Sequence, residues 1–307
     1  MESKHSTLLH RMIVAIAACY LLSAGSAAAV LAAGQSAPAA ASATTPAPVA
    51  PPASTAQPNV HVLPTPFVIP GLNRQRTVRI YLPPGYESAQ RRYPVLYMHD
   101  GQNLFDDATA YAGEWGVDET LNALATSRGL KLIVVGIDNG GADRIHELNA
   151  WDHPEYGKAE GSEYLAFIVE VLKPWVDQHY RTIPDKRHTG IIGSSMGGLI
   201  SSYAISRYPE VFGVAGIFSP AYWLAPQAFA DSGLRPPPHA ERIYFYAGGS
   251  EAENMVPDMK RMVAVLRRAG LPAHNLEVQV NPVGRHNEAA WRAEFPRAVE
   301  WLFRGRH

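Results

Sequence analysis

The sequence predicts an α/β domain built on a mostly parallel, doubly wound sheet of about eight strands, with helices on both faces. Strand-like and helical segments alternate from residue 60 towards the C-terminus. From the third one onward, the strand-like segments are continuous apolar runs, which is typical of parallel strands covered on both faces. Residues 60–307 also match the size of one large α/β domain, and no second domain is visible.

The elements are expected in a regular order along the chain. Strands are predicted where β-prone residues gather, at 60–69, 77–82, 93–98, 132–137, 189–192, 214–218, 243–246 and 276–280. Helices are predicted where apolar residues recur at helical spacing, at 117–127, 164–179, 196–207, 254–268 and 288–302. Pro296 lies in the last of these, and we expect it to split that helix and to open its second piece.

A G-x-S-x-G pattern occupies residues 193–197, between an expected strand and an expected helix. In such a turn the serine stands on a sharp, strained corner, so the residues two before it and two after it must be very small. Gly193 and Gly197 meet that demand. Ser195 is therefore the predicted nucleophile.

The residues that follow each strand carry the most information about function, because doubly wound sheets bind ligands at the carboxyl ends of their strands. Ser195 follows the fifth expected strand, Glu251 lies just beyond the seventh, and His286 lies beyond the eighth. This order of serine, acid and histidine is the one expected for an α/β-hydrolase fold.

Acyl transfer requires these three residue types, because a serine hydroxyl is a poor nucleophile until an imidazole accepts its proton, and a carboxylate then fixes the tautomer of that imidazole. We therefore predict His286 as the base and Glu251 as the acid. Glu253 and Asp258 lie in the same loop or helix start and remain alternatives for the acid, although either one could be a helix-start carboxylate favoured by the helix dipole.

The tetrahedral intermediate of such a reaction needs hydrogen-bond donors for its oxyanion. The backbone amide of Met196 is the first candidate, because it directly follows the nucleophile and begins a helix. The second candidate is the backbone amide of Gln102, in the loop after the third strand. An ordinary turn, in which Asp100 and Asn103 satisfy local backbone groups, is the alternative for that loop.

Several motifs occur in order over nearly all of residues 70–303, namely YPVLYMHDGQN at 93–103, VVGIDN at 134–139, LKP at 172–174, GSSMGG at 193–198 and HNE at 286–288. Together they resemble the esterase family that includes enterochelin (trilactone siderophore) esterases, feruloyl and acetyl-xylan esterases, S-formylglutathione hydrolases and mycolyltransferases. The resemblance implies an α/β-hydrolase fold and a serine mechanism without a metal or other cofactor.

Residue by residue, the resemblance implies Ser195 as nucleophile, His286 as base, and the amides of Met196 and Gln102 as oxyanion donors. The acid departs from the family pattern. Many members have an Asp in a G-[TS]-x-D context, whereas this chain has Gly249-Ser250-Glu251.

Substrate contacts are predicted from aromatic side chains near the expected active edge. Trp115, Tyr222, Trp223 and Trp291 each lie near a loop at that edge and could line an acyl or aryl pocket, with burial in the core as the alternative. Charged residues also follow the fourth strand, and we interpret them as a salt-bridged loop, with contact to a polar substrate as the alternative; they are Asp138, Arg144, His146 and Glu147.

The N-terminal region predicts export to the periplasm or out of the cell. Residues 1–33 combine a basic start, an apolar stretch over 12–22 and a small-residue region with A-x-A patterns, which together indicate a signal peptide. An N-terminal anchor, through an uncleaved segment or lipidation at Cys19, is the alternative. Residues 34–59 are almost entirely Ala, Pro, Ser and Thr and predict a disordered linker, so the catalytic domain is expected at 60–307.

The charge and the cysteine content exclude several kinds of partner and of site. The formal net charge of −1, with interspersed signs, argues against nucleic acid or an anionic membrane surface as a partner. Cys19 is the only cysteine, so the expected domain has no disulfide, thiolate zinc site or cysteine nucleophile. We predict an exported serine carboxylic-ester hydrolase that acts on a small acyl or aryl ester or a siderophore lactone. The alternatives are an acyltransferase of the same fold and a non-catalytic carbohydrate-binding member.

Overall fold

A computed structural model describes residues 53–237 and 240–305 of the 307-residue chain. The expected signal peptide and residues 34–52 of the expected linker lie outside the described residues. Residues 53–59, also expected in the linker, make hydrogen bonds to the folded domain, for example from the backbone N–H of Gln57 to Asp118 Oδ2 at 2.8 Å. The folded part therefore begins before residue 60. No helix in the described ranges has the length and apolarity to cross a membrane.

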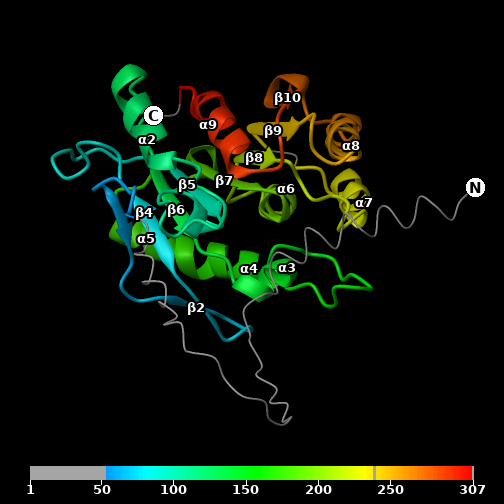
Figure 1. Ribbon diagram of the computed structural model, residues 1–307, viewed down its shortest axis with the longest axis horizontal. Helices are drawn as coiled ribbons and strands as arrows, with labels where there is room; N and C mark the ends of the chain where they lie inside the picture. The colour runs from blue at the N-terminus through cyan, green and yellow to red at the C-terminus, as the bar shows by residue number, and fades with distance from the viewer. Residues whose placement is uncertain (1–52, 238–239, 306–307) are drawn as a thin grey trace, which may run out of the picture. The chain divides into compact units, whose positions relative to one another are not determined.

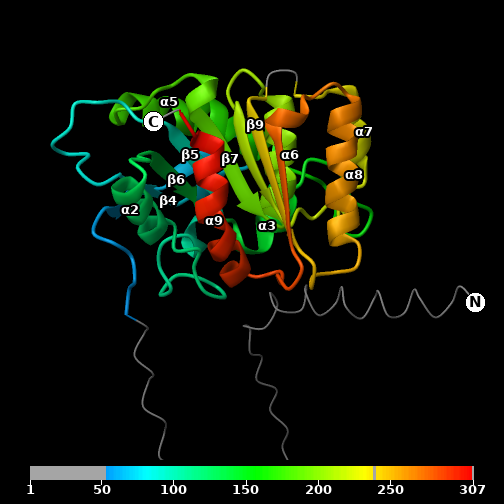
Figure 2. The same cartoon turned by 90° about the horizontal axis from the view of Figure 1, so that it is seen from above.

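The main sheet has eight strands, as the sequence predicts, in the order β1-β4-β6-β5-β7-β8-β9-β10. Their bounds are β1 Val60–Val62, β4 Val78–Tyr81, β5 Val95–His99, β6 Ile133–Ile137, β7 Thr189–Ser194, β8 Val214–Phe218, β9 Arg242–Gly248 and β10 Leu276–Asn281. β1 and β4 pair antiparallel, β4 and β6 pair antiparallel, and the other neighbours are parallel. The parallel strands run side by side in one direction, so their carboxyl ends share one edge (Figure 2).

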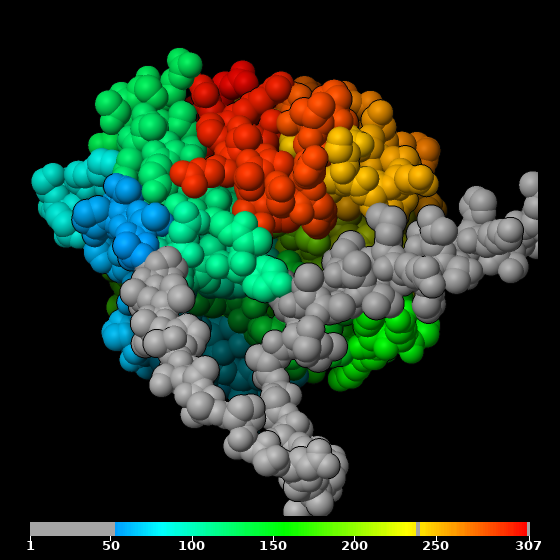
Figure 3. Space-filling view, in the orientation of Figure 1, coloured from blue at the N-terminus to red at the C-terminus, as the bar shows by residue number. Residues whose placement is uncertain are grey.

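Helices cover both faces of this sheet (Figure 1). One face packs against α2 (Val117–Ser127) and α9 (Glu288–Phe303). The other packs against α4 (Gly161–Ala166), α5 (Lys173–His179), α6 (Met196–Arg207), α7 (Gln227–Leu234) and α8 (Met255–Arg268). In the space-filling view, α9 (red) lies at the surface between α2 on one side and β10 with α8 on the other (Figure 3).

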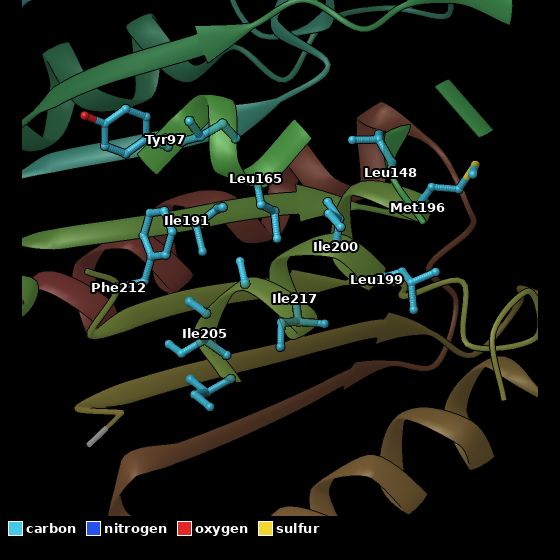
Figure 4. Packing of buried hydrophobic residues seen from close by; sticks show 14 of the residues in the cluster. Tyr97, Leu148, Leu165, Ile191, Met196, Leu199, Ile200, Ile205, Phe212 and Ile217 are labelled. Carbon is cyan, nitrogen blue, oxygen red and sulfur yellow. The ribbon is translucent and has the colours of Figure 1, made fainter. Parts of the chain in front are cut away.

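The core follows from the twofold alternation of side chains along a strand. In β5, Leu96 and Met98 join the cluster under α2 and α9, whereas Val95 and Tyr97 join the opposite cluster. Figure 4 shows part of the second cluster, in which β-strand side chains such as Ile191 pack against residues of the covering helices. Each fully buried aliphatic side chain of this kind contributes about 1.5–3 kcal/mol, so both faces stabilise the sheet that carries the functional loops.

The expected strand at 60–69 is wrong as a single element. It divides into β1 and β2 (Phe67–Ile69), and β2 pairs with β3 (Arg74–Arg76) in a separate two-stranded sheet. Pro64 and Pro66 lie between β1 and β2, and a proline has no N–H to donate to a strand ladder.

The expected split of the last helix is also wrong, because α9 is continuous through Pro296. The proline removes one backbone hydrogen bond, but buried side chains on both sides of it, including Trp291, Phe295 and Val299, hold the helix against the sheet. The expected helix at 164–179 is a continuous helical segment from α4 to α5, with a π-helical stretch at Phe167–Leu172 between them. The sequence reading also missed α7 and the short helix α3 (Arg144–Glu147).

Candidate active site

Ser195 forms the turn between β7 and α6, at the carboxyl edge of the sheet. Its backbone has φ 57° and ψ −118°, a strained conformation for a residue with a side chain. A Cβ on Gly193 would lie 2.6 Å from the carbonyl carbon of Gly197, so only glycine allows the turn to close. The Ser195 N–H donates to the carbonyl of Phe218 at 2.9 Å, and its carbonyl accepts from Leu199 N–H at 3.0 Å. These hydrogen bonds fix the backbone of the half-buried Ser195 in the turn between β7 and α6.

His286 and Glu251 lie together, as the assignment of base and acid requires. His286 Nδ1 is 2.7 Å from Glu251 Oε2, and the Glu251 side chain is completely buried, whereas 34% of the His286 side chain is exposed. Because Nδ1 faces a carboxylate, the bonded tautomer carries its proton there and leaves Nε2 as an acceptor. The His286 ring also packs edge-on against Trp291, with ring centroids 5.1 Å apart.

The structure separates Glu251 from the two alternative acids. Glu251 Oε1 accepts hydrogen bonds from Ser219 Oγ at 2.7 Å and from the Gly248 N–H at 2.6 Å. Glu253 is exposed, and Asp258 accepts instead from Asn254 Nδ2 at 3.0 Å. Glu251 is thus the carboxylate that is both buried and bonded to the imidazole.

Ser219, which the sequence did not single out, bonds to the Glu251 carboxylate and to neighbouring elements. Its hydroxyl donates to Glu251 and accepts from Trp291 Nε1 at 2.9 Å, and its N–H donates to the Tyr246 carbonyl at 2.7 Å. Ser219 also has a positive φ of 43°, which is uncommon for a residue other than glycine. Ser219 is the first residue after β8. Because functional residues of such sheets follow the carboxyl ends of the strands, this position was a signal in the sequence.

The two backbone amides predicted as oxyanion donors both follow strands at the carboxyl edge of the sheet. Within the described ranges, neither the Met196 N–H, which begins α6, nor the Gln102 N–H, in the single turn Gly101–Asn103, has a hydrogen-bond acceptor. The alternative for this loop, an ordinary turn in which Asp100 and Asn103 bond to local backbone groups, is correct only for Asn103. Asn103 Oδ1 does accept from the Tyr111 N–H at 3.1 Å, but the Asp100 carboxylate is occupied by side chains.

The loops after β5 and β6 are fixed to each other by a partly buried ion pair. Arg144 Nε and Nη2 lie 2.6 and 2.8 Å from the two oxygens of Asp100, and Asn139 Nδ2 donates to the same carboxylate at 2.6 Å. Burial opposes ionisation of Asp100, but the charge and hydrogen bonds of Arg144, together with the hydrogen bond from Asn139, outweigh it and hold the pKa of this carboxyl below its usual value. A charged Asp100 therefore anchors the loop that carries Gln102.

The other charged residues after β6 are also engaged, which agrees with a salt-bridged loop. Asp138 pairs with Arg79 at 2.8 Å, Glu147 pairs with Arg76, and His146 Nδ1 lies 3.0 Å from a backbone carbonyl. His99 is a core histidine instead of a second base, because burial lowers its pKa to about 4 and its Nδ1 lies 2.8 Å from the hydroxyl of Tyr164.

The aromatic residues expected to bind substrate divide into buried and exposed ones. Trp115 is 3% exposed and packs against Phe218 and Trp291, while Tyr222 is 1% exposed and donates to Ser202 Oγ at 3.0 Å. Both are core side chains, so the structure does not bring them to an open surface. Trp223 is 39% exposed and remains accessible.

A family model described as "Putative esterase" matches residues 69–302. The chain belongs to this esterase family. Among curated proteins, the esterase is 27% identical over 236 residues to an endo-1,4-beta-xylanase/feruloyl esterase of Xylanibacter ruminicola, covering 75% of this chain and 30% of that protein. It is 26% identical over 188 residues to the ferri-bacillibactin esterase BesA of Bacillus subtilis, covering 52% of this chain and 62% of BesA.

Solved structures share the fold of the esterase. The enterobactin esterase FES of Shigella flexneri, crystallised in the presence of enterobactin, aligns with a TM-score of 0.66 and 21% identity, over 81% of this chain and 60% of that one. A ferulic acid esterase aligns with a TM-score of 0.59 and 20% identity, over 80% of this chain and 98% of that one. The protein is thus an α/β enzyme of the carboxylic-ester hydrolase class.

Proposed function

We propose that the esterase uses Ser195, His286 and Glu251 to hydrolyse carboxylic esters through an acyl-enzyme. The observation that carries the proposal is the hydrogen bond between His286 Nδ1 and the fully buried Glu251. It lies at the sheet edge where the strained turn presents Ser195. The Glu251 carboxylate is held by three hydrogen bonds and therefore fixes the orientation of the His286 ring. It also stabilises the positive charge that the ring acquires when it accepts the serine proton.

In this mechanism, His286 Nε2 accepts the Ser195 proton as Oγ attacks the ester carbonyl. The Met196 and Gln102 N–H groups stabilise the negative oxygen of the tetrahedral intermediate. Collapse of the intermediate expels the alcohol, which takes the proton from His286 and leaves the acyl group on Ser195. Water then attacks the acyl-enzyme by the same sequence, which releases the acid and restores the serine.

The substrate class proposed is a small acyl or aryl ester or a siderophore lactone. The names of the relatives support it, because they include a feruloyl esterase, a ferri-bacillibactin esterase and an enterobactin esterase. Among the four aromatic side chains predicted to contact substrate, Trp223, whose ring centroid lies 6.5 Å from that of Tyr156, is the one that offers an exposed surface to an aryl group.

The proposal is tested with p-nitrophenyl esters from acetate to octanoate, a feruloyl ester and a catecholate trilactone. We expect free acid to be formed in water without any acceptor alcohol. The acyl chain length that gives the highest kcat/KM indicates the size of the acyl pocket. Product that forms only when an acceptor alcohol is added would indicate an acyltransferase. Absence of turnover with every substrate would leave a binding protein and overturn the proposal.

We also propose that the esterase is exported, on the evidence of the signal-like residues 1–33. The test is fractionation of bacteria that produce the full chain or a variant lacking residues 1–33. We expect the full chain in the periplasm or medium, with its N-terminus cleaved, and the truncated chain in the cytoplasm. Recovery of both proteins from the cytoplasm would refute export.

A further inference from the structure

Three acidic side chains that are not part of the proposed catalytic machinery lie together at the N-terminal end of α2. They are Glu114, Asp118 and Glu119, and one carboxylate oxygen of each lies within 4.8 Å of those of the others. Glu114 is 4% exposed and Asp118 is completely buried. Buried carboxylates normally have a cation or several donors beside them, so this cluster requires an explanation.

The hydrogen bonds of the cluster satisfy only half of its oxygens. Glu114 Oε1 accepts from Thr55 Oγ1 at 3.1 Å, Asp118 Oδ2 from the Gln57 N–H at 2.8 Å, and Glu119 Oε1 from Gln57 Nε2 at 3.5 Å. The second oxygen of each carboxylate is buried and has no hydrogen-bond partner in the described part of the chain; these atoms are Glu114 Oε2, Asp118 Oδ1 and Glu119 Oε2.

The nearby positive charge does not balance three carboxylates. Arg292 approaches Glu114 Oε1 with its Nη1 at 3.6 Å, and its side chain is 44% exposed. Holding the buried carboxylates of Glu114 and Asp118 together out of water costs free energy. A divalent cation would remove that cost and give each unpartnered oxygen a ligand bond.

We propose that Glu114, Asp118 and Glu119 bind a Ca²⁺ ion. All of the donors are oxygens, which suit hard cations and not zinc, whose sites favour nitrogen and sulfur. Among hard cations, Mg²⁺ retains several waters and demands a small octahedral site, whereas Ca²⁺ accepts many protein oxygens in flexible geometry. The buried carboxylates therefore favour calcium.

The ion would fasten the N-terminal segment to the domain. Thr55 and Gln57 bond to the same carboxylates, so a cation that fixes these side chains also fixes residues 53–59. Glu114 also precedes Trp115, which packs against Trp291 with ring centroids 5.8 Å apart. The cation is structural, and no step of the proposed reaction passes through it.

The test compares thermal unfolding of the full chain in 1 mM EDTA with unfolding in 5 mM CaCl2. For wild type we expect calcium to raise Tm by roughly 5–10 °C, as a ligand that saturates the folded state does for a domain of this size. Asp118→Asn should abolish the shift, and in EDTA it should unfold at or above the wild-type temperature, because it removes a buried like charge. Glu155→Gln, at an exposed acid elsewhere, should keep the full shift.

Terbium(III) provides a second measurement, because it occupies oxygen-rich calcium sites and emits when a nearby tryptophan transfers energy to it. We expect terbium emission from wild type on excitation of the tryptophans, of which Trp115 is adjacent in sequence to Glu114, and we expect calcium to compete with it and Asp118→Asn to reduce it at least tenfold. A Tm that is equal in EDTA and calcium would overturn the proposal. An Asp118→Asn protein that responds like wild type would also overturn it, and an equal response to MgCl2 would overturn the assignment to calcium.

Ester turnover provides a further distinction between this site and the catalytic one. At 25 °C, where the protein is folded in both media, kcat should differ by less than about twofold between EDTA and calcium, because none of the three carboxylates belongs to the proposed catalytic machinery. A loss of turnover in EDTA that calcium restores, without any change in Tm, would contradict a structural role.

Discussion

Ser195→Ala is expected to lower kcat/KM for ester hydrolysis by at least about 10³-fold while leaving the protein folded. The substitution removes the hydroxyl but retains the Cβ, so the strained backbone and its hydrogen bonds to Phe218 and Leu199 are unchanged. The measurement is turnover of p-nitrophenyl acetate, with Tm and far-ultraviolet circular dichroism as controls for folding. A folded variant that retains a tenth of the activity would exclude Ser195 as the nucleophile.

His286→Ala should cost a similar factor, and the double variant should be no worse than either single one. The two residues act as one unit: without His286 the Ser195 hydroxyl has no base, and without Ser195 the imidazole has no hydroxyl to deprotonate. Multiplication of the two losses would instead mean that serine and histidine contribute to separate steps, and the proposed proton transfer would be wrong.

Glu251→Gln is expected to lower kcat by roughly 10²–10⁴-fold with little change in KM, because Glu251 touches His286 and not the substrate. A glutamine keeps the volume of the side chain and can still accept from Ser219 and the Gly248 N–H. Its amide group no longer stabilises the imidazolium and favours the wrong tautomer of His286.

The alternative acids supply matched controls for Glu251. Glu253→Gln removes an exposed carboxylate and Asp258→Asn removes one that accepts from Asn254, so each should change kcat by less than about threefold. If either control lowers kcat more than Glu251→Gln does, Glu251 is not the acid of the proposed mechanism.

Local sequence predicted the sheet and the corner that carries Ser195. The apolar runs of the parallel strands need no knowledge of distant residues, because burial on both faces requires apolar side chains at every position. The sharp turn is equally local, since Gly193 and Gly197 meet each other within one turn of the chain. Where local rules failed, as at Pro296, packing of Trp291, Phe295 and Val299 outweighed the helix-breaking tendency of one residue.

The partner of His286 was not predictable from the sequence in the same way. Glu251, Glu253 and Asp258 lie within a stretch of eight residues, and each of them satisfies the chain order of serine, acid and histidine. Only the folded chain buries Glu251 and brings it to His286, which is 35 residues away. The same is true of Ser219, whose hydroxyl bonds to Glu251, 32 residues away, and to Trp291, 72 residues away.

The sequence by itself thus determined the α/β class, the strained turn at Ser195 and the family of the chain, because these depend on short-range periodicity, on steric limits at glycine and on contiguous motifs. The tertiary structure decided which acid supports His286, placed Trp115 and Tyr222 in the core, and gathered Glu114, Asp118 and Glu119 around one point. The physical reason is that burial and hydrogen bonding between distant segments depend on how helices and strands pack, and several arrangements satisfy the same local pattern.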